Sequence, residues 1–291
     1  MPGGLTFIDA INWPSGSGTG DDRYGFDESA GTAWVVDGAT DIGTMRLFPD
    51  SLKSGQSQSL GWESDAAWYA DRLSERFTRP PETGETTAVY LERVIRDMAA
   101  IAAEESALPI DGQPRHNLPS AGGIWMRRQE NTLEFATLGD CMAIVETGGR
   151  CEIVGDIEAI RDEYRRWGET LRSANREAGF AQARAVRNRM NTPGAHWVFS
   201  LHPEAAQHAE TTRIKMRGNA NVLLMSDGFF RLIEPYAAHD AASLIAAASE
   251  DDGLPKLAAE LRGREQNPGE DAAMGRLKTT DDACALLVEI S

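Results

Sequence analysis

Aspartates stand at the ends of three apolar segments in this sequence. These are Asp37 after residues 33–36, Asp227 after residues 222–225, and Asp281 with Asp282 before residues 283–288. Each segment has the length and β-branched content of a buried strand, so the carboxylates are expected on rigid elements, near the points where strands end. Carboxylates held in this way predict a metal site.

The Asp-Gly dipeptide also has a simpler interpretation, because it is the strongest short signal for a β-hairpin turn. At Asp111 and Asp252 it lies in polar sequence that needs only turn chemistry. At Asp37 and Asp227 it follows an apolar strand, without the matching second strand that a two-residue hairpin requires. For each aspartate alone both interpretations stay open, and together with Asp281 they favour a function.

Three further carboxylates belong with this set. Asp21 and Asp22 lie in an early loop, and Asp140 lies in a tight turn that its side chain also suits for purely local reasons. Several unpaired carboxylates share one site only when divalent cations or protons neutralise them. Oxygen ligands without His or Cys select Mg²⁺ or Mn²⁺, and two such ions bind a hydroxide and clamp a phosphoryl group. Hydrolysis of a phosphate ester is therefore the leading hypothesis.

The carboxylates lie in five short motifs that follow one another along the chain. These are Asp21-Asp22-Arg23, Val36-Asp37-Gly38, Leu138-Gly139-Asp140, Met225-Ser226-Asp227-Gly228 and Asp281-Asp282. In order and spacing they resemble the metal-dependent serine/threonine protein phosphatases of type 2C, from about residue 5 to residue 290. Each motif is short, so the ordered set carries the resemblance.

The resemblance implies the α+β fold of that family, a four-layer α-β-β-α sandwich of two antiparallel sheets flanked by helices. It also implies a dinuclear Mg²⁺ or Mn²⁺ site at one end of the cleft between the sheets. Asp37 resembles the ligand that bridges both ions, beside the carbonyl of Gly38. Asp21 resembles the acidic ligand of the second ion.

The remaining carboxylates also match positions of the family. Asp227 and Asp281 resemble ligands of the first ion, and Asp140 resembles a ligand of a weaker third ion. Asp22 matches an acid that holds metal-bound water. The implied activity is hydrolysis of phosphoserine and phosphothreonine in phosphorylated proteins, a signalling reaction for which Asp22, Asp37 and Asp227 are the expected catalytic residues.

Two departures from the family pattern bear on catalysis. Ala39 stands where the family usually has a His that protonates the leaving group, and Ser17 stands where it commonly has an Arg that binds phosphate. Arg23 is a candidate replacement for that Arg, with a surface ion pair as its ordinary alternative. Loss of these two residues makes a pseudophosphatase, a phosphoprotein-binding or regulatory module, the second hypothesis; a hydrolase of small phosphorylated metabolites is the third.

Composition narrows the partners and the location. The formal charge of -16 opposes binding to nucleic acid. The N-terminus lacks the pattern of a signal peptide and no apolar run is long enough to span a bilayer, so we expect a cytoplasmic protein without a membrane segment. The three cysteines form no C-x-x-C pair and are expected to be reduced. The oligomeric state, the substrate and the pathway do not follow from the sequence.

Periodicity predicts the elements of a single domain over residues 1–291. Expected strands are residues 5–12, 33–36, 122–127, 132–137, 142–146, 151–154, 197–201, 213–216, 222–225 and 283–290, with the group from 120 to 155 forming one antiparallel meander. Expected helices begin near residue 64 and residue 91 and lie at 235–249 and 255–262. The loop to residue 63 is a candidate lid over the site.

The segment 156–190 is predicted to be helical and is locally basic, with eight Arg against six acidic residues. A solvated helix face with ion pairs explains this composition. By the resemblance it occupies the place of the family's variable flap, a helical insertion that contacts substrate.

Overall fold

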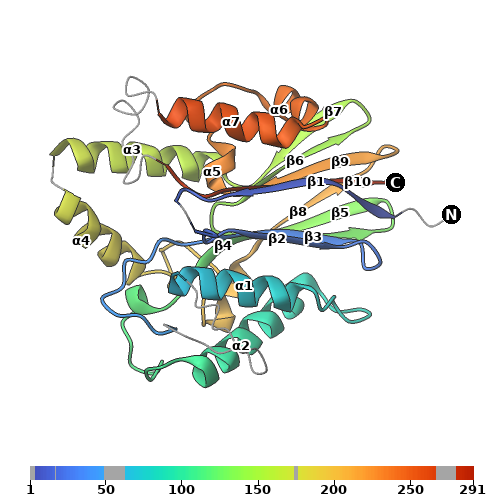
Figure 1. Cartoon of the computed structure of the whole chain (residues 1–291). Coiled ribbons are helices and arrows are strands. Elements are labelled where there is room, and N and C mark those ends of the chain that lie inside the picture. Colours follow the sequence, from blue (N-terminus) through green and yellow to red (C-terminus); the bar gives the residue numbers. More distant parts are fainter. Residues whose placement is uncertain (1–3, 17, 49–62, 174–175, 267–279) are drawn as a thin grey trace.

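The protein is described from a computed structural model that covers residues 4–16, 18–48, 63–173, 176–266 and 280–291. In these residues, two five-stranded antiparallel sheets pack face to face (Figure 1). The first sheet has the order β1 (Leu5–Trp13), β10 (Ala283–Ile290), β9 (Ala220–Met225), β6 (Met142–Thr147) and β7 (Arg150–Val154). The second has the order β2 (Arg23–Asp27), β3 (Thr32–Gly38), β4 (Ala121–Gln129), β5 (Thr132–Leu138) and β8 (Glu210–Lys215).

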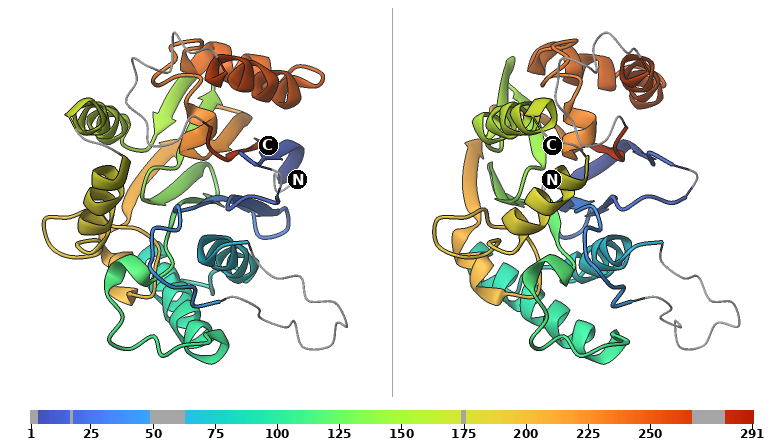
Figure 2. Two further views of the ribbon diagram at one scale, coloured as in Figure 1. Left: turned by 60° about the vertical axis from the view of Figure 1, so that its left-hand side comes forward. Right: turned by 90° about the vertical axis from the view of Figure 1, so that its left-hand side faces the viewer.

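Helices cover the outer face of each sheet (Figures 1 and 2). The second sheet is covered by α1 (Asp65–Phe77) and α2 (Thr87–Glu105), and the first by α5 (Asp227–Phe230), α6 (Ala241–Ala248) and α7 (Gly253–Glu265). One apolar layer lies between the two sheets, and a further one lies between each sheet and the helices that cover it. The α-β-β-α sandwich is therefore confirmed. No helix in the described ranges is long and apolar enough to cross a membrane.

The predicted meander over residues 120–155 is wrong. The four strands form two hairpins in different sheets: β4 pairs with β5 in the second sheet, and β6 pairs with β7 in the first. The chain crosses between the sheets at Gly139, Asp140 and Cys141, where Gly139 has a φ of 89°. Local alternation of apolar residues gives the strands but not the sheet to which each belongs, so the crossing was not visible in the sequence.

Other elements also differ from the sequence prediction. Strand β2 was missed because it is short and contains Gly25, whose Cα packs against the ring of Trp34 so closely that a Cβ would lie 2.3 Å from it. The predicted strand 197–201 is a single bridge between Phe199 and Ala121. Helix α6 begins only at Ala241, after a capping box at Asp240.

The basic segment forms two helices, α3 (Ile157–Ser173) and α4 (Arg176–Arg187). They lie at the left-hand end of the sandwich in Figure 1, the end at which β10 begins, and come to the front in the right-hand view of Figure 2. The side chain of Arg187 donates a hydrogen bond of 3.1 Å to the carbonyl of Thr40, three residues after Asp37. The C-terminal end of α4 therefore packs beside the segment that follows β3.

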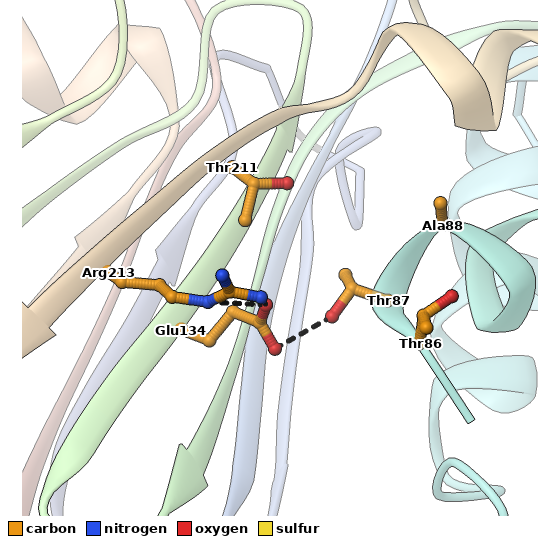
Figure 3. A pocket seen from close by; sticks show the side chains of 6 residues that line it. All are labelled: Thr86, Thr87, Ala88, Glu134, Thr211 and Arg213. Carbon is orange, nitrogen blue, oxygen red and sulfur yellow. Dashed lines mark hydrogen bonds and ion pairs between the residues drawn. The ribbon is translucent and has the colours of Figure 1, made fainter. Parts of the chain in front are cut away.

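A buried carboxylate joins α2 to the second sheet beside a hollow of about 420 Å³ (Figure 3). The side chain of Glu134 is 1% exposed, and its two oxygens accept hydrogen bonds from Arg127 at 2.6 Å, Arg213 at 2.6 Å and Thr87 at 2.9 Å. Burial by itself would raise the pKa of Glu134, but these donors hold it below its usual value. The network fixes the first turn of α2 on β5 and β8.

We expect Glu134→Gln to lower the free energy of unfolding at neutral pH by about 3 kcal/mol, because two guanidinium groups lose their shared carboxylate. Since the folded-state pKa of Glu134 is depressed, its stabilisation is present above the unfolded pKa and is lost as pH falls through the folded one. The difference from wild type should therefore shrink in urea titrations below about pH 4. Glu210→Gln, at an exposed position of β8, is the control; a pH-independent difference for Glu134→Gln would contradict the assignment.

Candidate metal centre

The second sheet brings two aspartates to one end of the sandwich. Asp37 is the penultimate residue of β3 and pairs with Gly122 at the start of β4. Asp140, at the crossing between the sheets, places its Oδ1 so close to Gly122 that a Cβ there would lie 2.5 Å away. The absence of a side chain at Gly122 therefore lets the carboxylate of Asp140 lie beside the end of β3. Nothing in the sequence pattern marked Gly122.

The first sheet brings Asp227 and Asp281 to the same end. Asp227 begins α5 immediately after β9, and Asp281 lies two residues before β10. The two strand ends are joined at Ser226, whose amide donates to the carbonyl of Cys284 and whose hydroxyl accepts from the Cys284 amide, both at 3.0 Å. These bonds hold the two aspartates on neighbouring strands of one rigid sheet.

The glycines after Asp37 and Asp227 are required by close packing. A Cβ on Gly38 would lie 2.7 Å from the backbone oxygen of Asp21, and one on Gly228 would lie 1.9 Å from the carbonyl oxygen of Asp282. Neither dipeptide forms the turn of a two-residue hairpin, since β3 is followed by a loop and β9 by α5. The hairpin interpretation is therefore wrong at both positions.

Asp282 ties the early loop to this end of the sandwich. Its Oδ1 accepts from the amide of Ser15 at 2.6 Å and its Oδ2 from the amide of Asp21 at 2.5 Å. Asp21 in turn accepts from the hydroxyl of Ser64, which also caps α1 by accepting from Ala67. The loop that carries Asp21 and Asp22 is thus held by the residue before β10 and by the N-terminus of α1. Ser17 lies outside the described residues.

Electrostatics show that the carboxylates are close neighbours. Burial raises the pKa of Asp37, and the charges of Asp22, Asp227 and Asp140 and a hydrogen bond with Asp227 raise it further. The pKa of Asp22 is raised by burial and by Asp282, Asp281 and Asp227, against a hydrogen bond from Ser226 that lowers it. These six residues, Asp22, Asp37, Asp140, Asp227, Asp281 and Asp282, are called the acid cluster below. Asp22 and Asp37 therefore favour a bound proton, or an equivalent positive charge.

Two arginines contact the acid cluster or its loop. Arg23 donates to the carbonyls of Gly20 at 3.0 Å and Asp22 at 2.6 Å and lies 3.4 Å from Asp71, so its guanidinium braces the loop. Arg231, which the sequence analysis did not single out, is 3% exposed and donates to Asp281 Oδ2 at 2.7 Å. The only signal for it was its position four residues after Asp227, one helical turn away.

The chemistry of the acid cluster fits a hard divalent cation. Its donors are carboxylate oxygens, and the buried Oδ2 of Asp22 has no hydrogen-bond partner among the described residues. Asp37 and Asp227 lie within hydrogen-bond reach of each other, and two carboxylates so close repel each other unless a proton or a cation offsets their charge. Within the described ranges no three acidic, His or Cys groups yet surround one point as ligands. The six carboxylates are therefore close neighbours that do not form a finished ligand shell in the described ranges.

The chain is similar to known proteins in its structure. No protein-family model and no curated protein matches the sequence. Among solved structures, the serine/threonine phosphatase PstP of Mycobacterium tuberculosis matches with a TM-score of 0.55 at 13% identity, covering 98% of each chain. The photosystem II phosphatase PBCP matches with a TM-score of 0.55 at 14% identity, covering 99% of each chain. The fold is that of the type 2C phosphatases.

The same fold is shared with a second structure of PstP, its catalytic domain in complex with two manganese ions, at a TM-score of 0.52 and 13% identity over 99% of each chain. The resemblance that the five motifs carry is thus confirmed for the fold. At these identities the type 2C fold is what the comparison shows, and the ligands of individual ions in this chain stay predictions.

We expect Asp37→Asn and Asp227→Asn to weaken Mn²⁺ binding about a hundredfold or more, because each removes a charge that the cation needs. Metal-free variants should melt at the wild-type temperature or above it, since one source of repulsion is gone. Differential scanning calorimetry with and without Mn²⁺ measures both effects.

Asp111→Asn is the matched control, because Asp111 belongs to an exposed Asp-Gly turn far from the cluster in sequence. A variant of Asp37 that Mn²⁺ stabilises as strongly as wild type would remove Asp37 from the metal centre.

Proposed function

We propose that this protein hydrolyses phosphoserine and phosphothreonine esters in phosphorylated proteins, with Mg²⁺ or Mn²⁺ as cofactor. The observation that carries the proposal is the convergence of aspartates from both sheets at one end of a type 2C fold. Such a concentration of negative charge on buried and half-buried side chains is costly, and it has a use when cations and an anionic phosphoryl group must be held together.

Two ions would divide the carboxylates of the cluster, together with Asp21, between them. Asp37 would contact both, with the carbonyl of Gly38 beside it, and Asp21 would contact the second. Asp227 and Asp281 would hold the first, and Asp140 a weaker third. When bound, divalent cations supply an activated water and positive charge for the phosphoryl oxygens.

The chain itself supplies proton handling beside these ligands. Asp22 is 1% exposed, its pKa is raised first of all by burial, and Ser226 lies within hydrogen-bond reach of its carboxylate. Cations bound to the neighbouring carboxylates would lower the pKa of Asp22 again, because positive charge favours the ionised form. Asp22 would then orient the attacking water and accept its proton.

The flap-like insertion at 156–190 would contact the phosphoprotein. Its second helix ends at Arg187 beside Thr40, which places a basic segment at the rim of the acidic site. Residues 49–62 of the candidate lid lie outside the described residues. The cytoplasmic location and the signalling role belong to this same proposal.

One observation favours the pseudophosphatase as the alternative. Asp281, an expected ligand, is already ion-paired with the buried Arg231 at 2.7 Å. A chain that only binds phosphoproteins would have no need to release that carboxylate.

The deciding experiment is hydrolysis of a phosphoserine peptide by the purified protein with Mn²⁺, with Mg²⁺ and with excess chelator. We expect hydrolysis that chelator abolishes, that added Mn²⁺ restores, and that Asp37→Asn lacks. Hydrolysis unaffected by chelator would contradict metal-dependent catalysis, and cation binding without hydrolysis of any phosphopeptide would favour the binding module.

Ala39 predicts an unusual dependence on the leaving group. It lies two residues after Asp37, and its backbone amide donates a hydrogen bond of 3.0 Å to the carbonyl of Ser120. Its methyl side chain cannot donate a proton to a leaving group. A serine alkoxide needs protonation on departure, and a positioned acid typically contributes about 10²–10⁴-fold, whereas an aryl oxide needs little help. We therefore expect Ala39→His to raise kcat for a phosphoserine peptide and to leave the rate for an aryl phosphate nearly unchanged. Ala39→Gln controls for size, and an equal effect of Ala39→His on both substrates would show that proton donation at residue 39 does not limit the reaction.

A further inference from the structure

A buried arginine is built into the edge of the acid cluster. Arg231 is the C-cap of α5, and its backbone amide donates a hydrogen bond of 3.1 Å to the carbonyl of Asp227. Its side chain is 4% exposed. One terminal nitrogen donates to Asp281 Oδ2 at 2.7 Å and the other to Glu265 Oε1 at 2.9 Å. The guanidinium is therefore fixed between the last turn of α7 and a predicted metal ligand.

The ion pair with Glu265 does not neutralise the whole charge of Arg231. Glu265 is fully buried, and its other oxygen accepts from Arg262 at 2.5 Å. Arg262 also donates to the carbonyl of Trp13 at 2.7 Å, which ties this pair to the end of β1. One carboxylate shared by two guanidinium groups leaves one positive charge, and that charge faces Asp281.

We propose that Arg231 is a built-in counter-ion of the acid cluster, which neutralises Asp281 in the metal-free protein and competes with the divalent cation for that carboxylate. The inference rests on the proposed function, since it assumes that the cluster binds a cation. Arg231 is a positioning residue and touches no substrate.

The positive charge of Arg231 and its buried position explain both effects. A guanidinium beside the cluster offsets repulsion among its carboxylates, which stabilises the protein before a cation binds. The same charge repels an arriving cation, and in a buried environment this repulsion is only weakly screened. Burial alone would lower the pKa of Arg231, but Asp281 and other nearby groups hold it above its usual range, so the charge persists at every working pH.

The experiment measures the melting temperature of the metal-free protein and the Kd for Mn²⁺, by calorimetry, in Arg231→Met and Arg231→Lys. Arg231→Met keeps an apolar stem and removes the charge. It should melt below wild type without metal and bind Mn²⁺ at least about tenfold more tightly. Arg231→Lys keeps the charge, and its Kd should stay within about threefold of wild type.

Arg127→Met is the matched control, because Arg127 is also largely buried and ion-paired, with Glu134 in the other sheet. It should lower the melting temperature and leave the Kd for Mn²⁺ unchanged. If Arg231→Met does not fold, Glu265→Gln tests the same idea with the opposite sign, since it leaves more positive charge on Arg231 and should weaken Mn²⁺ binding.

Three results would overturn the inference. An unchanged Kd in Arg231→Met would make the arginine purely structural, and a weaker Kd would mean that it holds Asp281 ready for the cation. A Glu265→Gln variant that binds Mn²⁺ as tightly as wild type would also show that the charge of Arg231 does not affect cation binding. In each of these cases wild type still binds Mn²⁺ and the proposed function stands, whereas a wild-type protein that binds no Mn²⁺ overturns both.

Discussion

Repulsion among closely placed carboxylates, one buried and the others half-buried, is the constraint on which this structure depends. Asp22 and Asp37 have raised pKa values because they lie away from water and beside other aspartates. A fold that holds these groups together must be stabilised elsewhere, and three apolar layers between four layers of secondary structure provide that stability. This repulsion is concentrated at one end of the sandwich, where a positive charge would stabilise the protein most.

The backbone brings the carboxylates to one end of the sandwich, and hydrogen bonds to the side chains of Asp281 and Asp282 hold them there. Each sheet delivers strand ends to the same edge, and the crossing at Asp140 joins the two sheets there. Gly38, Gly122 and Gly228 have neighbours where a Cβ would stand. Because the main chains approach so closely, the aspartates beside them have little freedom to move apart. Rigid placement of this kind is what a metal or catalytic site needs from its scaffold.

The sequence predicted most of the strands and the set of aspartates, because apolar strands with terminal acids are local patterns. The sandwich followed from the resemblance that the ordered motifs carry. It did not predict that the hairpins at β4–β5 and β6–β7 belong to different sheets, since pairing between distant strands leaves no local trace. It did not reveal the role of Gly122 either, because a glycine is informative only when its spatial neighbour is known. Arg231 was missed for the same reason: its partners, Asp281 and Glu265, lie 50 and 34 residues away.

The central claim is that the acid cluster at the joined ends of the sheets is a site for divalent cations. The most direct measurement is anomalous diffraction from crystals of the wild-type protein grown with Mn²⁺. We predict anomalous peaks within coordination distance of the carboxylate oxygens of Asp37 and Asp227. Peaks confined to surface carboxylates, with none between Asp37 and Asp227, would contradict it.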